Sequence, residues 1–116
     1  MIGGISEAAL SKIRGVLRCY PQVEQAIVYG SRAKGTHKNG SDIDLTLQGG
    51  DELTFDIFGK ILIDLDNQFL PYSIDLSIFA DITDTDLIAH IRRVGIVLYR
   101  KDAEDSARGT ALEQAQ

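Results

Sequence analysis

The sequence predicts a single α/β domain in which helices flank a small mixed β-sheet. Its 116 residues suffice for one hydrophobic core but are too few for two. Apolar residues recur at helical spacing in three segments, and they cluster or alternate as in strands in four others. The segments follow one another as helix, strand, turn, strand, helix, strand, helix and strand. That order is typical of an α/β sandwich.

The first elements have clear boundaries in the sequence. Ser6 is a suitable N-cap for an amphipathic helix that ends before Pro21. Residues 25–29 are rich in strand-forming side chains and end at a glycine, which predicts a short buried strand. Residues 31–34 are expected to form a helical turn, and residues 35–41 a polar loop.

The remaining elements are expected in the second half of the chain. They are a strand over 42–47, a helix over 53–69 ended by Pro71, a strand over 72–79, a helix capped by Thr83 or Asp84 and ended by Gly95 as a C′ glycine, and a strand over 96–99. This last strand could form a sheet edge that pairs with another copy or a partner. We expect the domain to span residues 1–100. Residues 101–116 are polar and small, and are expected to be a tail without assigned chemistry, helical at most near its end.

Composition excludes several functional classes. No apolar run approaches the roughly 20 residues that span a bilayer, so no membrane interaction is expected. Residues 1–5 lack the basic region and apolar block of a secretory signal, so we expect a cytoplasmic protein. The single cysteine, Cys19, can form neither an internal disulfide nor a cysteine-rich zinc site.

Charge is unevenly distributed along the chain. The net charge is +4 over residues 1–40, −10 over 41–86 and +1 over 87–116, which gives −5 in total. Non-specific binding to a nucleic acid duplex requires a basic surface, so direct nucleic acid binding is not expected. An acidic centre next to a basic entry suggests that cations and phosphates meet there.

Two acidic residues near the start of the second expected strand are the first candidates for a site. Asp42 and Asp44 are two residues apart, so their carboxylates project from the same face of the strand. Two such anions repel each other, and a divalent cation with a preference for hard oxygen ligands, magnesium or manganese, would hold both ionised. A serine and an aspartate at a strand start are also common as a capping or turn feature, which is the alternative.

Asp75 is the third acidic candidate. It lies in the middle of a strand-like segment, where aspartate is disfavoured, and its parity places it on the polar face. A third ligand on an adjacent strand would explain this position. The alternative is an acid on an edge strand that faces water.

Gly30 and Ser31 form the other half of the candidate site. A glycine after a strand allows a tight turn, and the serine then opens a helical turn whose free N–H groups can hold a phosphate. Arg32 or Lys34 could add positive charge for a triphosphate. Both could equally be turn residues that face solvent.

The spacing of these residues resembles a known family. Gly30-Ser31, ten intervening residues and Asp42-x-Asp44 resemble the signature of the DNA polymerase β-like nucleotidyltransferases. The segment Tyr-Gly-Ser-Arg-Ala-Lys-Gly, followed by Gly-Ser-Asp-Ile-Asp-Leu, is most similar to the minimal nucleotidyltransferases. The third acid of the family pattern matches Asp75. The resemblance covers the chain from the first helix to about Tyr99 and implies the nucleotidyltransferase fold.

The resemblance also implies a mechanism. Asp42 and Asp44 would bridge two Mg²⁺ ions, or Mn²⁺, and Asp75 would bind the ion nearer the acceptor hydroxyl. Gly30 and Ser31 would hold the outer phosphates of ATP, the expected substrate, although the residues do not determine the base. No alternative catalytic set is apparent, because His37 and His90 are expected to be structural or exposed.

The chain is too short to include a domain for recognising an acceptor. The resemblance therefore points to a partner, since minimal nucleotidyltransferases occur with small helical HEPN-domain proteins, often as the antitoxin of a toxin–antitoxin pair. The implied activity is AMP transfer from ATP to a tyrosine of the toxin. Two alternatives remain: an antitoxin that neutralises its partner by binding alone, and an adenylyltransferase for a small molecule such as an aminoglycoside. A homo-oligomer or a complex with the partner is compatible with each.

Overall fold

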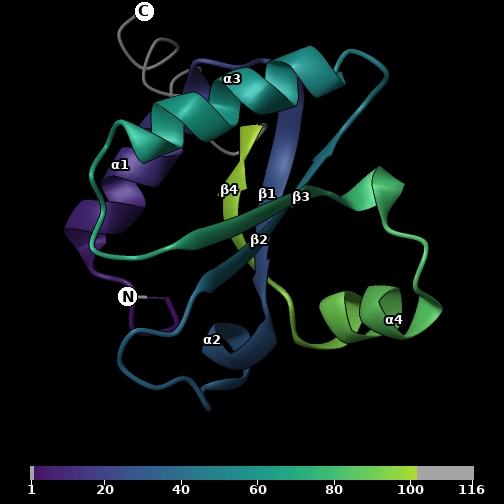
Figure 1. The fold of residues 1–116 in the computed structure, drawn as a ribbon. Coiled ribbons are helices and arrows are strands. Elements are labelled where there is room, and N and C mark those ends of the chain that lie inside the picture. The colour runs from purple at the N-terminus through teal and green to yellow at the C-terminus, as the bar shows by residue number, and fades with distance from the viewer. Residues whose placement is uncertain (1, 102–116) are drawn as a thin grey trace, which may run out of the picture.

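A computed structural model describes residues 2–101 and shows the expected succession of elements (Figure 1). The elements are α1 (Glu7–Arg18), β1 (Val23–Tyr29), α2 (Gly30–Lys34), β2 (Ile43–Gly49), α3 (Phe55–Asp66), β3 (Ile74–Ile78), the 3-10 helix η1 (Phe79–Asp81), α4 (Thr85–Val94) and β4 (Ile96–Arg100). Only η1 was not expected. The tail predicted for residues 101–116 lies, except for Lys101, outside the described residues.

The four strands form one mixed sheet in the order β3-β2-β1-β4. β1 pairs antiparallel with β2 and with β4, whereas β2 and β3 are parallel. Parallel neighbours require a crossover connection, and α3 supplies it. The mixed sheet flanked by helices is confirmed, and the expected edge position of the last strand is also confirmed.

Strand register separates an apolar face of the sheet from a polar one. On β2, the side chains of Ile43, Leu45 and Leu47 are fully buried. Asp44 and Thr46 point to the opposite face, because successive residues of a strand alternate. The same parity holds on the parallel neighbour β3, where Leu76 pairs with Leu45.

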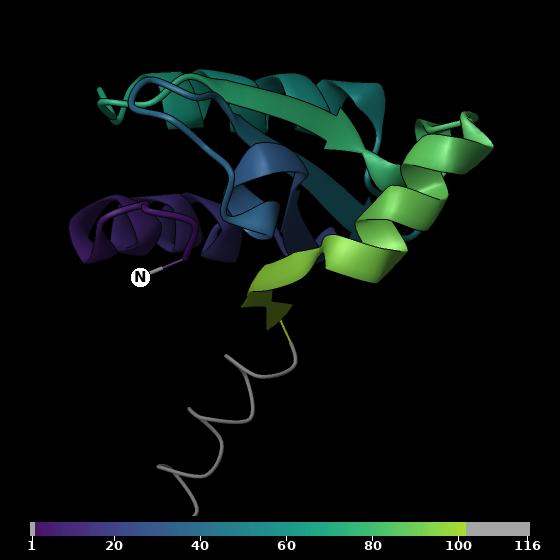
Figure 2. The same cartoon turned by 90° about the horizontal axis from the view of Figure 1, so that it is seen from below.

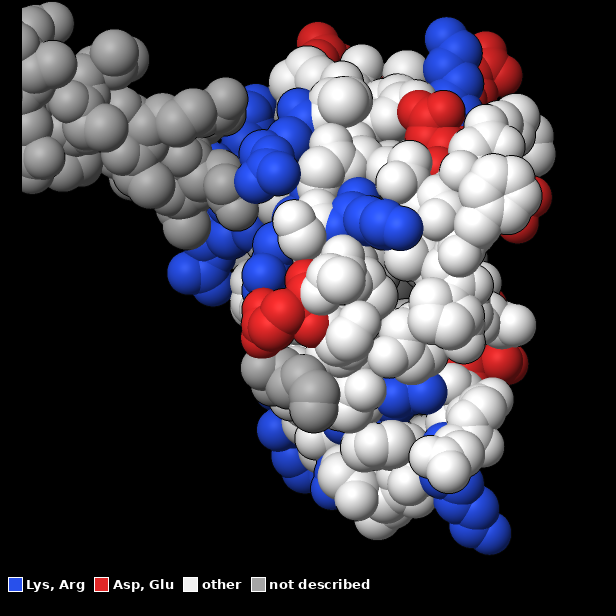
Figure 3. All heavy atoms as spheres, turned by 90° about the vertical axis from the view of Figure 1, so that its left-hand side faces the viewer, with Lys and Arg blue, Asp and Glu red and all other residues white. Residues whose placement is uncertain are grey.

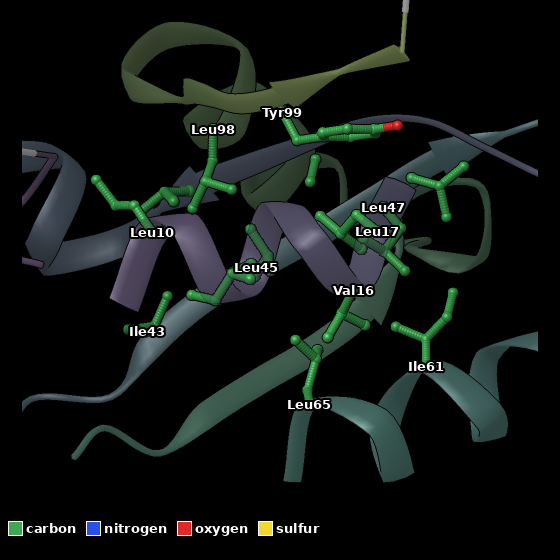
Figure 4. Packing of buried hydrophobic residues seen from close by; sticks show 14 of the residues in the cluster. Leu10, Val16, Leu17, Ile43, Leu45, Leu47, Ile61, Leu65, Leu98 and Tyr99 are labelled. Atoms are coloured by element: carbon green, nitrogen blue, oxygen red, sulfur yellow. The ribbon is translucent and has the colours of Figure 1, made fainter. Parts of the chain in front are cut away.

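The apolar face packs against α1 and α3. Figure 4 shows side chains from these helices meeting those of β2 and β4 in one cluster: Leu10, Val16, Leu17, Ile43, Leu45, Leu47, Ile61, Leu65, Leu98 and Tyr99. Full burial of each aliphatic side chain contributes about 1.5–3 kcal/mol. The hydroxyl of Tyr20 donates a hydrogen bond to Asp64 of α3, and this bond raises the pKa of Tyr20 to about 12. The two helices therefore hold one face of the sheet and leave the other for a site.

Side-chain caps fix the starts of the longer helices. The Ser6 hydroxyl accepts a hydrogen bond from the N–H of Ala9 at α1, as predicted. Of the two candidate caps for α4, Asp84 is the N-cap, and its carboxylate accepts from the N–H groups of Asp86 and Leu87. Each such cap stabilises a helix by about 1 kcal/mol.

α3 is shorter than predicted, and its end is strained. The helix stops at Asp66 rather than at residue 69. Phe69 has φ of +51°, and it is the only residue other than glycine with a positive φ among those described. A bulky residue in this left-handed region costs about 1–2 kcal/mol and cannot continue a right-handed helix.

Gly95 is needed for a different reason than predicted. It follows α4, but its φ of −59° and ψ of 141° are not the left-handed conformation of a C′ glycine. A Cβ atom there would lie 2.3 Å from the carbonyl oxygen of Ile91 and 2.6 Å from Cγ2 of Ile27. The glycine therefore allows close packing of α4 against β1.

We expect Gly95→Ala to destabilise the protein by about 1–3 kcal/mol, because the added methyl group overfills a packed contact. The measurement is urea unfolding. Gly59→Ala is the matched control, because no heavy atom lies within 4 Å of a Cβ at Gly59, within α3. That control should be about 0.5–1 kcal/mol more stable than the wild type. Equal stability of Gly95→Ala and the wild type would contradict the packing argument.

Candidate active site

Acidic side chains from two adjacent strands share the polar face of the sheet. Asp44 of β2 and Asp75 of β3 are direct register partners. Asp42 immediately precedes β2 and is exposed, as is Asp75, whereas Asp44 is half-buried. The alternative for Asp75 was an acid on an edge strand that faces water. β3 is indeed an edge strand, and Asp75 is exposed on it. The structure nevertheless places it beside Asp44.

The carboxylates are close enough to influence one another. The pKa of Asp44 is raised above its ordinary value, first because burial disfavours the charged form and then because Asp75 and Asp42 repel it. His90 opposes this shift. The three acids thus form one electrostatic unit, with Asp44 at its centre.

Tyr29, at the end of β1, forms a row with Asp44 of β2 and Asp75 of β3. Tyr29 is the register partner of Asp44 on the side opposite Asp75. Burial raises the pKa of Tyr29, the carboxylates of Asp44 and Asp75 raise it further, and a hydrogen bond with Ser77 partly opposes them. Two register pairs further along β2 and β3, the hydroxyl of Ser77 donates to that of Thr46 at 2.9 Å, which also links the two strands on this polar face.

Gly30 lies directly against Asp44. It opens α2 with φ of +73°, a conformation that favours glycine. A Cβ atom at Gly30 would lie 2.2 Å from Oδ2 of Asp44. The glycine predicted from the motif is therefore required twice, once by its backbone conformation and once by the approach of the carboxylate.

His90 is a site residue that sequence analysis missed. Gly30 donates its backbone N–H to Nε2 of His90 at 3.1 Å, and the His90 ring packs edge-on against Tyr29, with ring centroids 6.2 Å apart. This N–H is thus engaged by His90 and does not face a ligand. His90 belongs to α4, which lies beside α2 at the end of the molecule that faces the viewer in Figure 2. It is 60 residues from Gly30 in sequence, so no local motif could have revealed the contact.

Ser31 and Arg32 follow Gly30 but face different surroundings. Ser31 is half-buried in the first turn of α2, whereas Arg32 is only 4% exposed. Nη1 of Arg32 donates to the carbonyl of Gly3 at 2.7 Å, and Nε and Nη2 donate to the carbonyl of Ser41 at 3.1 and 2.8 Å. The guanidinium also lies 4.9 Å from the ring centroid of Tyr72.

These contacts correct the expectation for Arg32. Its guanidinium is directed to backbone carbonyls and an aromatic ring rather than to a phosphate position, and it is not a solvent-facing turn residue either. Because Ser41 immediately precedes Asp42, Arg32 holds the loop that delivers this acid to the site. Lys34 is exposed, as its alternative reading proposed.

The carboxylates of Asp42, Asp44 and Asp75 fit a hard divalent cation in their chemistry, although their side chains are not arranged around a common point. Among residues 2–101, no three His, Cys, Asp or Glu side chains converge on a common point as metal ligands do. The fit lies in the chemistry of three neighbouring carboxylates, since their mutual repulsion is relieved by a shared cation. Asp42 and Asp75 are exposed and can rotate toward such an ion.

Asp44→Asn should raise the thermal unfolding temperature at pH 7 without added divalent cations. Because the folded-state pKa of Asp44 lies above 3.8, its ionisation lowers stability as pH rises from about that value through the folded-state pKa. A neutral amide removes this cost. At a partly exposed site the gain should not exceed about 1 kcal/mol, or about 8 °C.

Calorimetry across pH tests this expectation. The difference between variant and wild type should vanish below pH 3.8, the ordinary pKa, where both side chains are neutral. Asp51→Asn, at an exposed turn after β2, is the control and should show no comparable gain. A lower unfolding temperature for Asp44→Asn at pH 7 would show that Asp44 is not under repulsion.

Comparisons with known proteins agree with this geometry. A family model described as polymerase beta, nucleotidyltransferase matches residues 11–104. A search of curated proteins returns no match. Among the described residues, no helix has the length and apolar character needed to cross a bilayer.

Solved structures of similar fold include toxin–antitoxin complexes. One is a toxin–antitoxin crystal structure with AMP-PNP, at a TM-score of 0.64 and 22% identity over 91% of this chain and 87% of that chain. Another is a tri-AMPylated Shewanella oneidensis HEPN toxin in complex with MNT antitoxin, at a TM-score of 0.60 and 18% identity over 94% and 87%. A third, MntA–HepT, has a TM-score of 0.60 and 18% identity over 95% and 88%.

At these identities the structures establish a shared fold. The family match covers most of the chain, from within α1 to beyond β4, and it includes the row of acids and the glycine that admits Asp44. This chain therefore belongs to the polymerase β nucleotidyltransferase family.

Proposed function

We propose that this nucleotidyltransferase moves AMP from ATP to a tyrosine hydroxyl of a HEPN-domain toxin and so acts as its antitoxin. The observation that carries the catalytic part is the packing of Gly30 against Asp44, with Asp75 as the register partner of Asp44. The partner and the nucleotide are supported by the similar folds found with a HEPN toxin and with AMP-PNP. The expected cytoplasmic location is part of the same proposal.

Each site residue has a distinct role in this proposal. Asp42, Asp44 and Asp75 would hold two divalent cations, with magnesium expected and manganese as the alternative. When bound, the cations supply charge neutralisation for the triphosphate and lower the pKa of the acceptor hydroxyl. The hydroxyl of Ser31 donates a hydrogen bond to the outer phosphates. Gly30 keeps the space beside Asp44 open.

The transfer is a displacement at the α-phosphorus of ATP. The tyrosine oxygen forms a new bond to this phosphorus, and the bond from the phosphorus to the oxygen that bridges the α- and β-phosphates breaks. Pyrophosphate leaves with that oxygen, and Asp75 accepts the proton of the tyrosine hydroxyl. The products are an AMP-tyrosine ester and pyrophosphate, so the step requires no other reactant.

Replacing both Asp42 and Asp44 by Asn should reduce AMP transfer by on the order of 100-fold or more, because electrostatic groups at such sites contribute on this scale. The assay incubates the chain with α-labelled ATP, magnesium and the HEPN-domain protein encoded beside it, and follows label on the partner. A chelator should abolish transfer by the wild type. The control is Asp51→Asn with Glu52→Gln, two exposed acids after β2 that should leave transfer unchanged.

The same assay separates the alternatives. Full labelling by the double Asn variant would defeat the proposed site. An antitoxin that acts by binding alone would protect cells as well with the double variant as with the wild type. A small-molecule adenylyltransferase would leave the partner unlabelled and modify an aminoglycoside instead, which mass spectrometry would detect.

His90 is expected to act by positioning Gly30. His90→Ala leaves the Gly30 N–H without its partner, and we expect transfer to fall by about 10-fold, the equivalent of one lost hydrogen bond. His90→Gln keeps an acceptor within reach and should recover most of the activity. The measurement is kcat and KM for ATP, with partner binding as the control readout. Equal loss in both variants would contradict a role through the hydrogen bond to Gly30.

A further inference from the structure

The outward side of α3 carries apolar residues that the core does not bury. Ile61 and Leu65 are buried, but Leu62 is 39% exposed and Ile63 62% exposed. Phe55, which begins the helix, is 84% exposed. Single exposed apolar residues are common, whereas several on one side of a helix indicate a contact surface.

A hollow continues from this side of α3 onto the connection to β3. It has a volume of about 680 Å³. Besides the core residue Leu65, its lining includes six apolar or aromatic residues, which we call the α3 groove: Leu62, Ile63, Phe69, Leu70, Tyr72 and Ile74. The connection that forms one wall runs along the left-hand side of Figure 1. Figure 3 views this side directly and shows a stretch of uncharged surface, with acidic side chains along its right-hand edge and basic side chains elsewhere around it.

Phe69 is the residue of the groove that most lowers the stability of the isolated chain. Its side chain is 88% exposed although it is aromatic, and its φ of +51° is a strained conformation for any residue with a bulky side chain. Exposure and strain both oppose folding of the chain alone. Burial of the ring by another molecule would offset both, which is how strained residues at binding surfaces persist.

The α3 groove adjoins the proposed acceptor side of the active site. Ser73 and Ile74 line the hollow and directly precede Asp75, and Ile74 and Asp75 belong to β3. β3 is an edge of the sheet, so no strand within residues 2–101 separates the groove from the face that carries Asp75. A protein seated in the groove can therefore extend around this edge to Asp75.

Charge around the groove specifies the chemistry of its occupant. Asp66 lines the hollow, and exposed Asp56 lies seven residues before Ile63 on the same side of α3. In a symmetric dimer each groove would face the same surface of the other copy, which would bring these acids together. An occupant with Lys or Arg beside an apolar strip fits better than a second copy.

We propose that the α3 groove is the docking surface for the acceptor protein, and that it receives an apolar segment flanked by Lys or Arg. This inference rests on the proposed function, because it takes the HEPN-domain partner as the occupant. Docking there holds the partner while its tyrosine reaches the ATP beside Asp75. The outer side of α3 would thereby supply acceptor recognition.

Phe69→Gly is the sharpest test. Glycine adopts a positive φ without strain, so the variant should unfold at a temperature no lower than the wild type, although it loses the ring. Its dissociation constant for the HEPN-domain protein encoded beside this chain should rise by about tenfold or more, as expected for loss of an aromatic anchor. Ile63→Ser and Asp66→Lys should also weaken binding, the latter most at low salt.

The control is Val97→Ser, which removes an apolar side chain of 39% exposure from β4, at the opposite edge of the sheet. It should bind the partner as the wild type does. Binding of AMP-PNP should be unchanged in all groove variants, whereas Asp44→Asn should lose transfer but keep partner binding. Isothermal titration calorimetry supplies both constants.

The outcomes separate this inference from the proposed function. If the wild type binds the partner through the groove but transfers no label, docking stands and the catalytic proposal fails. If the groove variants bind as tightly as the wild type while transfer proceeds, docking at this surface is overturned and the catalytic proposal stands. A wild type that does not bind the partner, or that forms a dimer which the groove variants dissolve, also overturns it.

Discussion

The candidate site depends on the close approach of a glycine backbone to a carboxylate. Gly30 follows β1 and lies against Asp44, at a distance that no side chain on residue 30 would permit. The antiparallel pairing of β1 with β2 brings these two residues together, and the parallel pairing of β2 with β3 adds Asp75 on the other side. A shift of one residue in either register would turn Asp44 or Asp75 to the apolar face and remove the site.

This arrangement has an electrostatic cost that suits its chemistry. Asp44 is half-buried between Tyr29 and Asp75, and both burial and neighbouring carboxylates disfavour its charge. Groups that destabilise a folded protein in this way are typical of active sites, where a ligand relieves the cost. The same reasoning applies to the α3 groove, where Phe69 combines strain with exposure. Both features lower the stability of the isolated chain, and a bound ligand or partner would offset this cost.

The rest of the fold supports the site from a distance. α1 and α3 occupy the apolar face of the sheet and leave the polar face open. α4 contributes His90, which holds the Gly30 N–H, and Gly95 lets this helix pack closely on β1. Arg32 fixes the loop before Asp42 through two backbone carbonyls. Two residues that resemble a surface histidine and a phosphate-binding arginine in sequence thus act by positioning the backbone.

Local patterns in the sequence determined the succession of elements and the face on which each strand residue lies. The alternation around Asp44 and Asp75, the caps at Ser6 and Asp84 and the helical stripes are set by neighbours within a few residues, so they can be recognised without a structure. The family resemblance of Gly30-Ser31 and Asp42-x-Asp44 rests on the same kind of short spacing.

Only the tertiary structure decided which distant residues meet. The parallel neighbour of β2, the contact of His90 with Gly30 and the burial of Arg32 depend on how whole elements pack, and no periodicity encodes that. The same holds for α3, where Ile61 and Leu65 are buried in the core but Leu62 and Ile63 lie at the surface. The sequence shows which side chains are apolar and would stabilise the protein when buried. Which surface buries them depends on how the other elements, or another protein, pack against them.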